Sequence, residues 1–169
     1  MRERELLFAG FGGQGVLTAG LIVAQIALYR GYFATWMPSY GAAMRGGTAN
    51  CTVHYSKEFI FNPGRQVPDL LLAMNMPSYE KFRSLVRPGG VVIANADFVQ
   101  PAESEADGVN LLMIPCNTIA DQLENPKGAN IVMVGAMMRW LGDVSQEEGV
   151  AGMNDMFRKK GKEKFEALN

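Results

Sequence analysis

The sequence offers few residues with which to build a metal centre. It contains two cysteines, Cys51 and Cys116, which lie 65 positions apart, and one histidine, His54. Structural zinc and iron–sulfur sites need several cysteine or histidine ligands, often as closely spaced pairs. This composition therefore excludes such a site built by this chain alone. Because free cysteines are usually buried, we expect both thiols to be reduced and packed, and His54 to pack against its neighbours.

Long apolar runs and a strong net charge are also lacking. No apolar run reaches the ~20 residues that span a bilayer, and the charged start Met1–Glu5 is not followed by the apolar core of a secretory signal. The formal net charge is −1 at pH 7, so no global basic field would attract nucleic acid or a membrane surface. We therefore expect a soluble, cytoplasmic protein with no nucleic-acid and no membrane partner.

Acidic residues are absent from a long stretch near the N-terminus. Between Glu5 and Glu58 there is no aspartate or glutamate. The basic residues within the same stretch are Arg30, Arg45 and Lys57. As a result, residues 1–57 carry a net charge of +3 and the remainder carries −4. The asymmetry matters because the acid-free stretch contains a glycine-rich loop.

Hydrophobic patterning predicts one α/β domain over residues 1–169, a single three-layer Rossmann-like domain with a mostly parallel sheet and a β-hairpin insert. Strands are predicted at 5–9, 32–37, 69–74, 90–95 and 111–114, and helices at 16–30, 77–85, 130–141 and 147–164. The hairpin is predicted to pair 49–55 with 59–61 through the polar turn 56–58. The first two strands and the helix between them should form a right-handed βαβ unit. Residues 40–48 and 97–108 are predicted to be loops.

The loop after the first strand has the spacing G-x-G-x-x-G. Gly10, Gly12 and Gly15 satisfy it, and Gly13 is an additional glycine. Glycine permits positive φ and close backbone approach, while the first amides of the following helix point outward without partners. The helix dipole adds positive potential, so a phosphate or carboxylate is the natural ligand. The alternative is a tight β–α turn that binds nothing.

A dinucleotide ligand makes a further demand on the sequence. Folds that bind nicotinamide or flavin dinucleotides place an acid about twenty residues past the loop, at the end of the second strand, for the ribose hydroxyls. Here that strand ends at Thr35–Ser39, and no acid occurs before Glu58. Dinucleotide binding is therefore the weaker interpretation. A free-standing dinucleotide-binding oxidoreductase and a ligand-sensing module that uses the same loop are kept as alternative functions.

A second glycine-containing segment follows the second predicted strand. If the first two strands are neighbours in the sheet, this segment lies at the same edge as the glycine loop. Arg45 would then offer a charged, bidentate donor beside the loop amides, and Gly46 and Gly47 would allow close approach of a ligand or another chain. The alternative is an exposed arginine in a flexible turn.

Three motifs together resemble a known family. They are Phe8-Ala9-Gly10-Phe11-Gly12-Gly13-Gln14-Gly15-Val16, Pro38-Ser39-Tyr40-Gly41 and Met44-Arg45-Gly46-Gly47-Thr48-Ala49-Asn50-Cys51. The sequence resembles the gamma subunit of 2-oxoacid:ferredoxin oxidoreductases, especially the 2-oxoglutarate type. The resemblance runs through most of the chain, including Pro68-Asp69 and the apolar segment after Asn130.

The resemblance implies a subunit without a complete active site. The family decarboxylates a 2-oxoacid with thiamine diphosphate, passes electrons through iron–sulfur clusters to ferredoxin, and forms an acyl-CoA. This chain lacks a Gly-Asp-Gly signature and cluster cysteines, so these cofactors would belong to thiamine-binding, 2-oxoacid-binding and ferredoxin-like partner subunits. Isolated, the chain could form a homo-oligomer. The implied residues of a shared coenzyme A site are Gly10, Gly12, Gly13, Gln14, Gly15, Arg45, Gly46 and Gly47.

The sequence departs from the family pattern at one place. Family members usually carry proline and glutamate where this chain has Ala42 and Ala43. Any contact that the glutamate makes with a partner subunit would be lost here. Pyruvate, branched-chain and indolepyruvate relatives share the general scheme, so the identity of the 2-oxoacid stays open.

Overall fold

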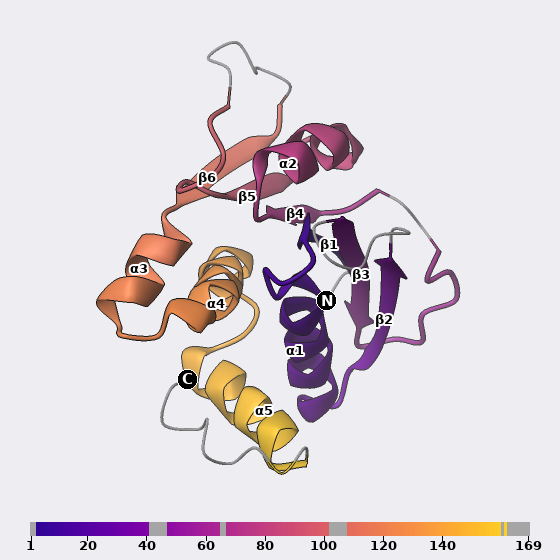
Figure 1. The fold of residues 1–169 in the computed structure, drawn as a ribbon. Helices are drawn as coiled ribbons and strands as arrows, with labels where there is room; N and C mark the ends of the chain where they lie inside the picture. The colour runs from indigo at the N-terminus through magenta and orange to yellow at the C-terminus, as the bar shows by residue number, and fades with distance from the viewer. Residues whose placement is uncertain (1–2, 41–46, 65–66, 102–107, 160, 162–169) are drawn as a thin grey trace.

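A computed structural model describes residues 3–40, 47–64, 67–101, 108–159 and 161. Within these residues, six strands form one sheet in the order β2-β3-β1-β4-β5-β6 (Figure 1). The strands are β1 (Arg4–Phe11), β2 (Phe33–Tyr40), β3 (Thr48–Ser56), β4 (Leu70–Ala73), β5 (Val91–Asn95) and β6 (Asn110–Ile114). The predicted α/β class with a mostly parallel sheet is confirmed, because β1, β4, β5 and β6 run parallel and only β3 opposes its neighbours.

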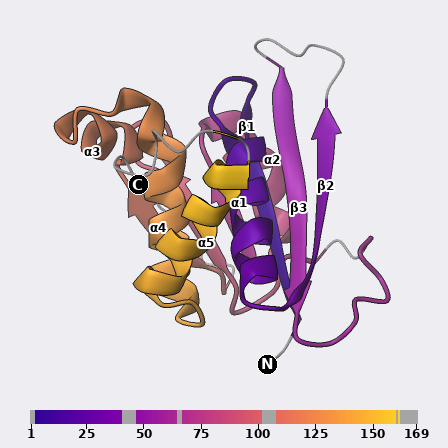
Figure 2. The same ribbon diagram turned by 90° about the horizontal axis from the view of Figure 1, so that it is seen from below.

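Helices cover both faces of the sheet, which gives three layers. One face carries α1 (Val16–Tyr29), α4 (Ala129–Leu141) and α5 (Gln146–Lys159), and the short α2 (Met76–Phe82) lies on the other (Figures 1 and 2). The 3-10 turn η1 (Arg83–Leu85) continues α2, and α3 (Cys116–Gln122) and η2 (Pro126–Gly128) lead into α4. Among the described residues, none of these helices is long and apolar enough to cross a bilayer.

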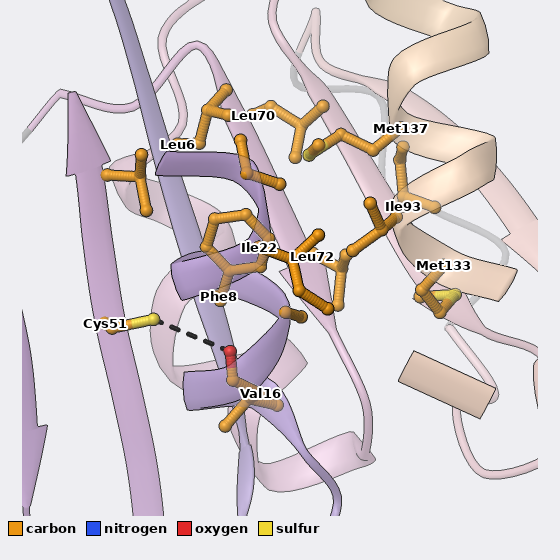
Figure 3. Packing of buried hydrophobic residues seen from close by; sticks show 14 of the residues in the cluster. Leu6, Phe8, Val16, Ile22, Cys51, Leu70, Leu72, Ile93, Met133 and Met137 are labelled. Atoms are coloured by element: carbon orange, nitrogen blue, oxygen red, sulfur yellow. Dashed lines mark hydrogen bonds between the residues drawn. The ribbon is translucent and has the colours of Figure 1, made fainter. Parts of the chain in front are cut away.

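The buried apolar side chains of the strands pack into two cores, one on each face of the sheet. Successive side chains of a strand point to opposite faces, so Leu6 and Phe8 face α1 and α4, whereas Leu7 and Ala9 face α2. Figure 3 shows the core that lies between the sheet and α1 and α4, in which Ile22 of α1 lies beside Phe8. The central strands β4 and β5 are apolar at almost every position because they are buried on both faces.

The predicted hairpin insert was wrong in its pairing partner. Residues 59–61 form no strand, and β3 instead pairs antiparallel with both β1 and β2. As a consequence β1 and β2 are not neighbours, although the βαβ unit that contains α1 is present. Strand β2 also continues through Pro38, where the sequence predicted a stop. An edge strand tolerates proline because one side of its backbone needs no partner.

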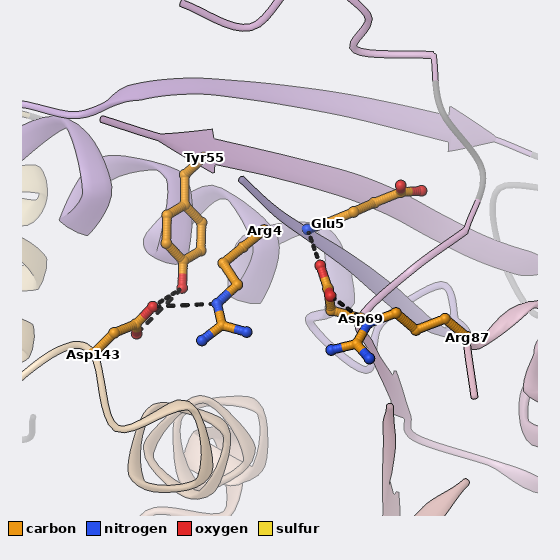
Figure 4. A network of polar contacts seen from close by, with 6 residues as sticks. All are labelled: Arg4, Glu5, Tyr55, Asp69, Arg87 and Asp143. Atoms are coloured by element: carbon orange, nitrogen blue, oxygen red, sulfur yellow. Dashed lines mark hydrogen bonds and ion pairs between the residues drawn. The ribbon is translucent and has the colours of Figure 1, made fainter. Parts of the chain in front are cut away.

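Two carboxylates, those of Asp69 and Asp143, make polar contacts at the end of the sheet opposite the glycine loop (Figure 4). Buried Asp69 accepts from the backbone N–H of Glu5 at 2.9 Å and from Nε of Arg87 at 2.5 Å, which joins β1 to the start of β4. Asp143, in the connection between α4 and α5, accepts from the Tyr55 hydroxyl at 3.0 Å and lies 3.5 Å from Nε of Arg4. Burial is the largest cause that raises the pKa of Tyr55, followed by the adjacent Asp143 carboxylate, so this hydroxyl remains a donor.

Candidate anion-binding site

The glycine loop lies at a topological switch point of the sheet. After β1 the chain forms α1 on one face and returns toward the β2 edge, whereas after β4 it forms α2 on the other face and returns at β5 (Figure 1). Adjacent parallel strands whose connections leave in opposite directions create a crevice at their carboxyl ends, where ligands of open α/β sheets bind. The loop Gly12–Gly15 follows β1 at this edge.

Two residues of the loop adopt the left-handed backbone conformation. Gly13 has φ 101° and Gly15 has φ 73°. Residues other than glycine are strained at these values of φ. A Cβ atom at Gly13 would meet open space, whereas one at Gly15 would lie 2.7 Å from Nδ2 of Asn130 in α4. Gly13 therefore faces an accessible space, and Gly15 is closed in by α4.

The loop and the first turn of α1 present unpaired backbone donors. Within the part of the chain that the structure describes, five backbone N–H groups donate no hydrogen bond: those of Gly13, Gly15, Val16, Leu17 and Thr18. The first turn of α1 contains no acidic residue and Gly15 provides no side-chain cap. Unpaired first-turn amides and the helix dipole together favour an anion.

Gln14 turns its side chain into the crevice between β1 and β4. Its Oε1 accepts from the backbone N–H of Phe11 at 2.7 Å and from Nδ2 of Asn75 at 2.7 Å, and its Nε2 donates to the carbonyl of Met74 at 3.3 Å. Gly10 lets three side chains pack close to β1, because a Cβ atom there would lie 2.7 Å from Cγ1 of Val16, 2.9 Å from Oε1 of Gln14 and 3.1 Å from Cβ of Met74. Gln14 and Gly10 thus support the loop from below rather than line its open side.

The segment before β3 contacts the loop through Gly47. The N–H of Gly12 donates to the Gly47 carbonyl at 3.1 Å, and the sheet register places the end of β2 beside the start of β3. The carboxyl end of β2 therefore lies at the same edge as the loop, as predicted, although β3 separates β2 from β1. Arg45 and Gly46, together with Ala42 and Ala43, lie outside the described residues.

Sequence patterns missed a row of asparagines at this edge. Asn75 follows β4, Asn95 ends β5 and Asn117 lies in α3. Asn130, the second residue of α4, donates to the Gly15 carbonyl at 3.2 Å. Asn95 Nδ2 donates to Asn117 Oδ1 at 2.9 Å and to the Met74 carbonyl at 3.4 Å. The available signal was an asparagine at the end of one apolar strand, Asn95 in β5, and another two residues after the end of β4, Asn75, at the edge where parallel strands end together.

The row ends at the short helix α3, which the sequence analysis did not predict. The carboxylate of Asp97 caps this helix by accepting from the N–H groups of Asn117 and Thr118 at 2.8 and 3.1 Å, and from the Thr118 hydroxyl at 2.6 Å. Burial acts to raise the pKa of Asp97, but these hydrogen bonds outweigh it and lower the pKa below its usual value. The carboxylate form, which can cap, is therefore favoured.

Neither cysteine belongs to the site. Cys51 and Cys116 are both free and buried, as expected from the sequence, and burial raises the pKa of each thiol to about 12. Protonated, enclosed thiols are poor nucleophiles and poor metal ligands. Within the described residues, no three histidine, cysteine, aspartate or glutamate side chains gather where they could hold a metal ion.

The fold and the site define a class: an α/β domain whose glycine loop presents unpaired backbone N–H groups at the topological switch point of the sheet. A family model described as pyruvate ferredoxin/flavodoxin oxidoreductase matches residues 5–169. The chain therefore belongs to the pyruvate ferredoxin/flavodoxin oxidoreductase family.

Two curated relatives are similar to this chain over nearly its whole length. The ketoisovalerate oxidoreductase subunit VorA of Methanothermobacter marburgensis is 38% identical over 171 residues, which cover 99% of this chain and 34% of VorA. The 2-oxoglutarate synthase subunit KorC of Methanocaldococcus jannaschii is 35% identical over 164 residues, which cover 96% of this chain and 88% of KorC. The chain thus spans about a third of the VorA relatives but most of KorC.

Two solved structures share the fold. The gamma subunit of a keto/oxoacid ferredoxin oxidoreductase from Geobacter sulfurreducens PCA matches with a TM-score of 0.74 and 29% identity, covering 90% of this chain and 85% of that one. The 2-oxoglutarate:ferredoxin oxidoreductase from Magnetococcus marinus, with 2-oxoglutarate, coenzyme A and succinyl-CoA bound, matches with a TM-score of 0.80 and 25% identity. That match covers 96% of this chain and 28% of the other.

Proposed function

We propose that this chain is the non-catalytic gamma-type subunit of a 2-oxoacid:ferredoxin oxidoreductase and that its glycine loop binds the phosphate end of coenzyme A. The observation that carries the proposal is the set of unpaired N–H groups of Gly13 and of Gly15 to Thr18 at the switch point. The Geobacter gamma subunit and KorC, which have nearly the same length, support the subunit assignment. Coenzyme A in the Magnetococcus structure supports the ligand. Residues 1–169 would act as one gamma-subunit domain.

In this proposal the backbone does most of the binding. Gly13 allows a phosphate to approach, the N–H groups of the first turn of α1 donate to its oxygens, and Gly12 and Gly47 hold the neighbouring segment in place. Arg45 and Gly46, which precede Gly47 in the sequence, would close the other side of the phosphate. Gln14 and Gly10 would shape the loop from beneath it.

Magnitudes indicate that another subunit must complete the site. An anion at a partly buried helix N-terminus gains up to ~2 kcal/mol, and one hydrogen bond to a charged group adds roughly 1.5–3 kcal/mol. A total of about 4 kcal/mol corresponds to a Kd of only ~1 mM. We therefore infer that partner subunits supply the remaining contacts to coenzyme A. From the family resemblance, thiamine-binding, 2-oxoacid-binding and ferredoxin-like partner subunits would hold thiamine diphosphate and the iron–sulfur clusters.

The 2-oxoacid substrate is proposed to be 2-oxoglutarate. KorC and the Magnetococcus enzyme are both named for 2-oxoglutarate, whereas VorA is named for ketoisovalerate. The glycine loop itself does not discriminate between them, because it would contact coenzyme A rather than the 2-oxoacid. Comparison of kcat/KM for 2-oxoglutarate, ketoisovalerate and pyruvate in the assembled complex decides the point.

Purification of the chain from its native source tests the subunit assignment. We expect it to bring down a brown complex that contains thiamine diphosphate and iron–sulfur clusters, because this chain has neither a diphosphate signature nor cluster cysteines of its own. Mass spectrometry and absorbance spectra of the purified material provide the measurement. A colourless monomer without companions would contradict the assignment.

Replacement of Arg45 by alanine tests the phosphate site. The KM for coenzyme A is expected to rise about tenfold, because one hydrogen bond to a charged group is lost. Arg45→Lys is the matched control: it retains the charge but not the bidentate fork, so an intermediate KM is expected. Steady-state kinetics of the reconstituted complex give both values. An unchanged KM for coenzyme A in Arg45→Ala would remove this residue from the site.

A further inference from the structure

The side chain of Asn75 has two separable tasks. The residue is 4% exposed and precedes α2, where its Oδ1 accepts from the backbone N–H of Ser78 at 2.9 Å and caps the helix. Its Nδ2 points the other way and donates to Oε1 of Gln14 at 2.7 Å. The same side chain therefore stabilises α2 on one side of the sheet and contacts the glycine loop above it.

The contact with Asn75 fixes which way the Gln14 amide faces. Two donors, the N–H of Phe11 and Nδ2 of Asn75, converge on Gln14 Oε1. Rotation of the amide by 180° would place its NH₂ group against both donors and would lose both hydrogen bonds. In the observed orientation, Nε2 is left to donate to the Met74 carbonyl. The loop is thus tied to both β1 and the end of β4.

We propose that Asn75 is a positioning residue for the anion-binding loop and acts on it through Gln14. The inference rests on the proposed function for its kinetic consequence, but not for the hydrogen bonds themselves. By bridging the end of β1 and the segment after β4, the Asn75–Gln14 pair holds the loop in the conformation that leaves the N–H groups of Gly13 and Gly15 unpaired. Asn95 supports the pair by donating to the same Met74 carbonyl at 3.4 Å.

Asn75→Asp separates the two tasks. Aspartate caps a helix as well as asparagine does, so α2 should be retained, but a carboxylate cannot donate to Gln14 Oε1 and repels it. In the assembled complex the KM for coenzyme A is expected to rise about tenfold, the factor that follows from one lost hydrogen bond, while the KM for the 2-oxoacid stays the same. A loss of folded complex would instead lower kcat and leave both KM values unchanged.

Hydrogen exchange provides a readout that does not depend on coenzyme A. In the full chain, the N–H of Phe11 is bonded to Gln14 Oε1, so Asn75→Asp is expected to speed exchange at Phe11 about tenfold. If wild-type activity proves independent of the glycine loop, the proposed function fails, and exchange at Phe11 still tests the positioning role. Unchanged exchange at Phe11 overturns the inference.

A double-mutant cycle shows whether Asn75 acts through Gln14. Gln14→Met keeps the length of the side chain but removes its polar atoms, so Asn75→Asp should add no further increase in the KM for coenzyme A in that background. Additive effects would show that Asn75 acts by another route and would overturn the inference. If the Asn75→Asp complex does not assemble, Asn75→Ser, which can still cap α2, takes its place in the same cycle with the same expected outcomes.

Discussion

Thr18→Glu is expected to raise the KM for coenzyme A on the order of a hundredfold while leaving the fold as stable as before. Thr18 is exposed in the first turn of α1, three residues after the N-cap Gly15. A glutamate at this position can reach back to the N–H of the N-cap residue. The new carboxylate would therefore occupy the Gly15 N–H, one of the donors proposed for the phosphate. At ~5 Å it would also repel the phosphate by about 3 kcal/mol at an effective dielectric constant near 20.

The two effects of Thr18→Glu have opposite signs, which makes the result specific. A glutamate at a helix N-terminus stabilises the helix by about 0.3–1 kcal/mol, so the Tm should not fall, whereas the use of coenzyme A should be impaired. Thr18→Gln is the matched control, because it has similar size without the charge. Calorimetry of the chain and steady-state kinetics of the complex provide the two measurements. Equal KM values for Thr18→Glu and Thr18→Gln would argue against an anion at this helix end.

Gly20→Val is expected to lower the free energy of unfolding by about 3 kcal/mol or more, because α1 packs too closely on the sheet to admit a side chain. A Cβ atom at Gly20 would lie 2.4 Å from Sγ of Cys51 and 3.3 Å from side-chain atoms of Phe8 and Val53. Figure 3 shows how closely Cys51 approaches the first turns of α1, where its Sγ donates to the Val16 carbonyl at 3.6 Å. Urea denaturation followed by circular dichroism measures the change.

Gly135→Val is the matched control for the packing effect. Gly135 is also inside a helix, α4, but a Cβ atom there has no neighbour within 4 Å, so the change should shift stability by no more than about 0.5 kcal/mol. The clash itself is tested by Gly20→Ala, which should cost less in a Cys51→Ala background that lacks the sulfur atom. Equal costs in both backgrounds would mean that contact with Cys51 does not limit the packing of α1.

Local patterns predicted those elements whose burial is encoded within a few residues. The apolar run from Leu6 to Ala9 gave β1, the broad apolar surface after Gly15 gave α1, and the segment from Asn130 to Leu141 gave α4 within one residue. Short α3 was missed because its seven residues bury only Cys116 and Ala120, which leaves too weak a periodicity to detect. The end of the predicted helix 147–164 lies outside the described residues beyond Lys159, apart from Gly161.

The sequence by itself determined the α/β class and the position of the glycine loop, because strand runs, helical periodicity and glycine spacing are local properties of the chain. Its motifs also carried the resemblance to the family. Only the tertiary structure decided that β3 lies between β1 and β2, since strand pairing depends on contacts between distant segments. It also decided the orientation of Gln14, whose partners Phe11 and Asn75 lie 3 and 61 positions away. A motif places a side chain in a loop, but the distant acceptors and donors around it determine where its polar atoms point.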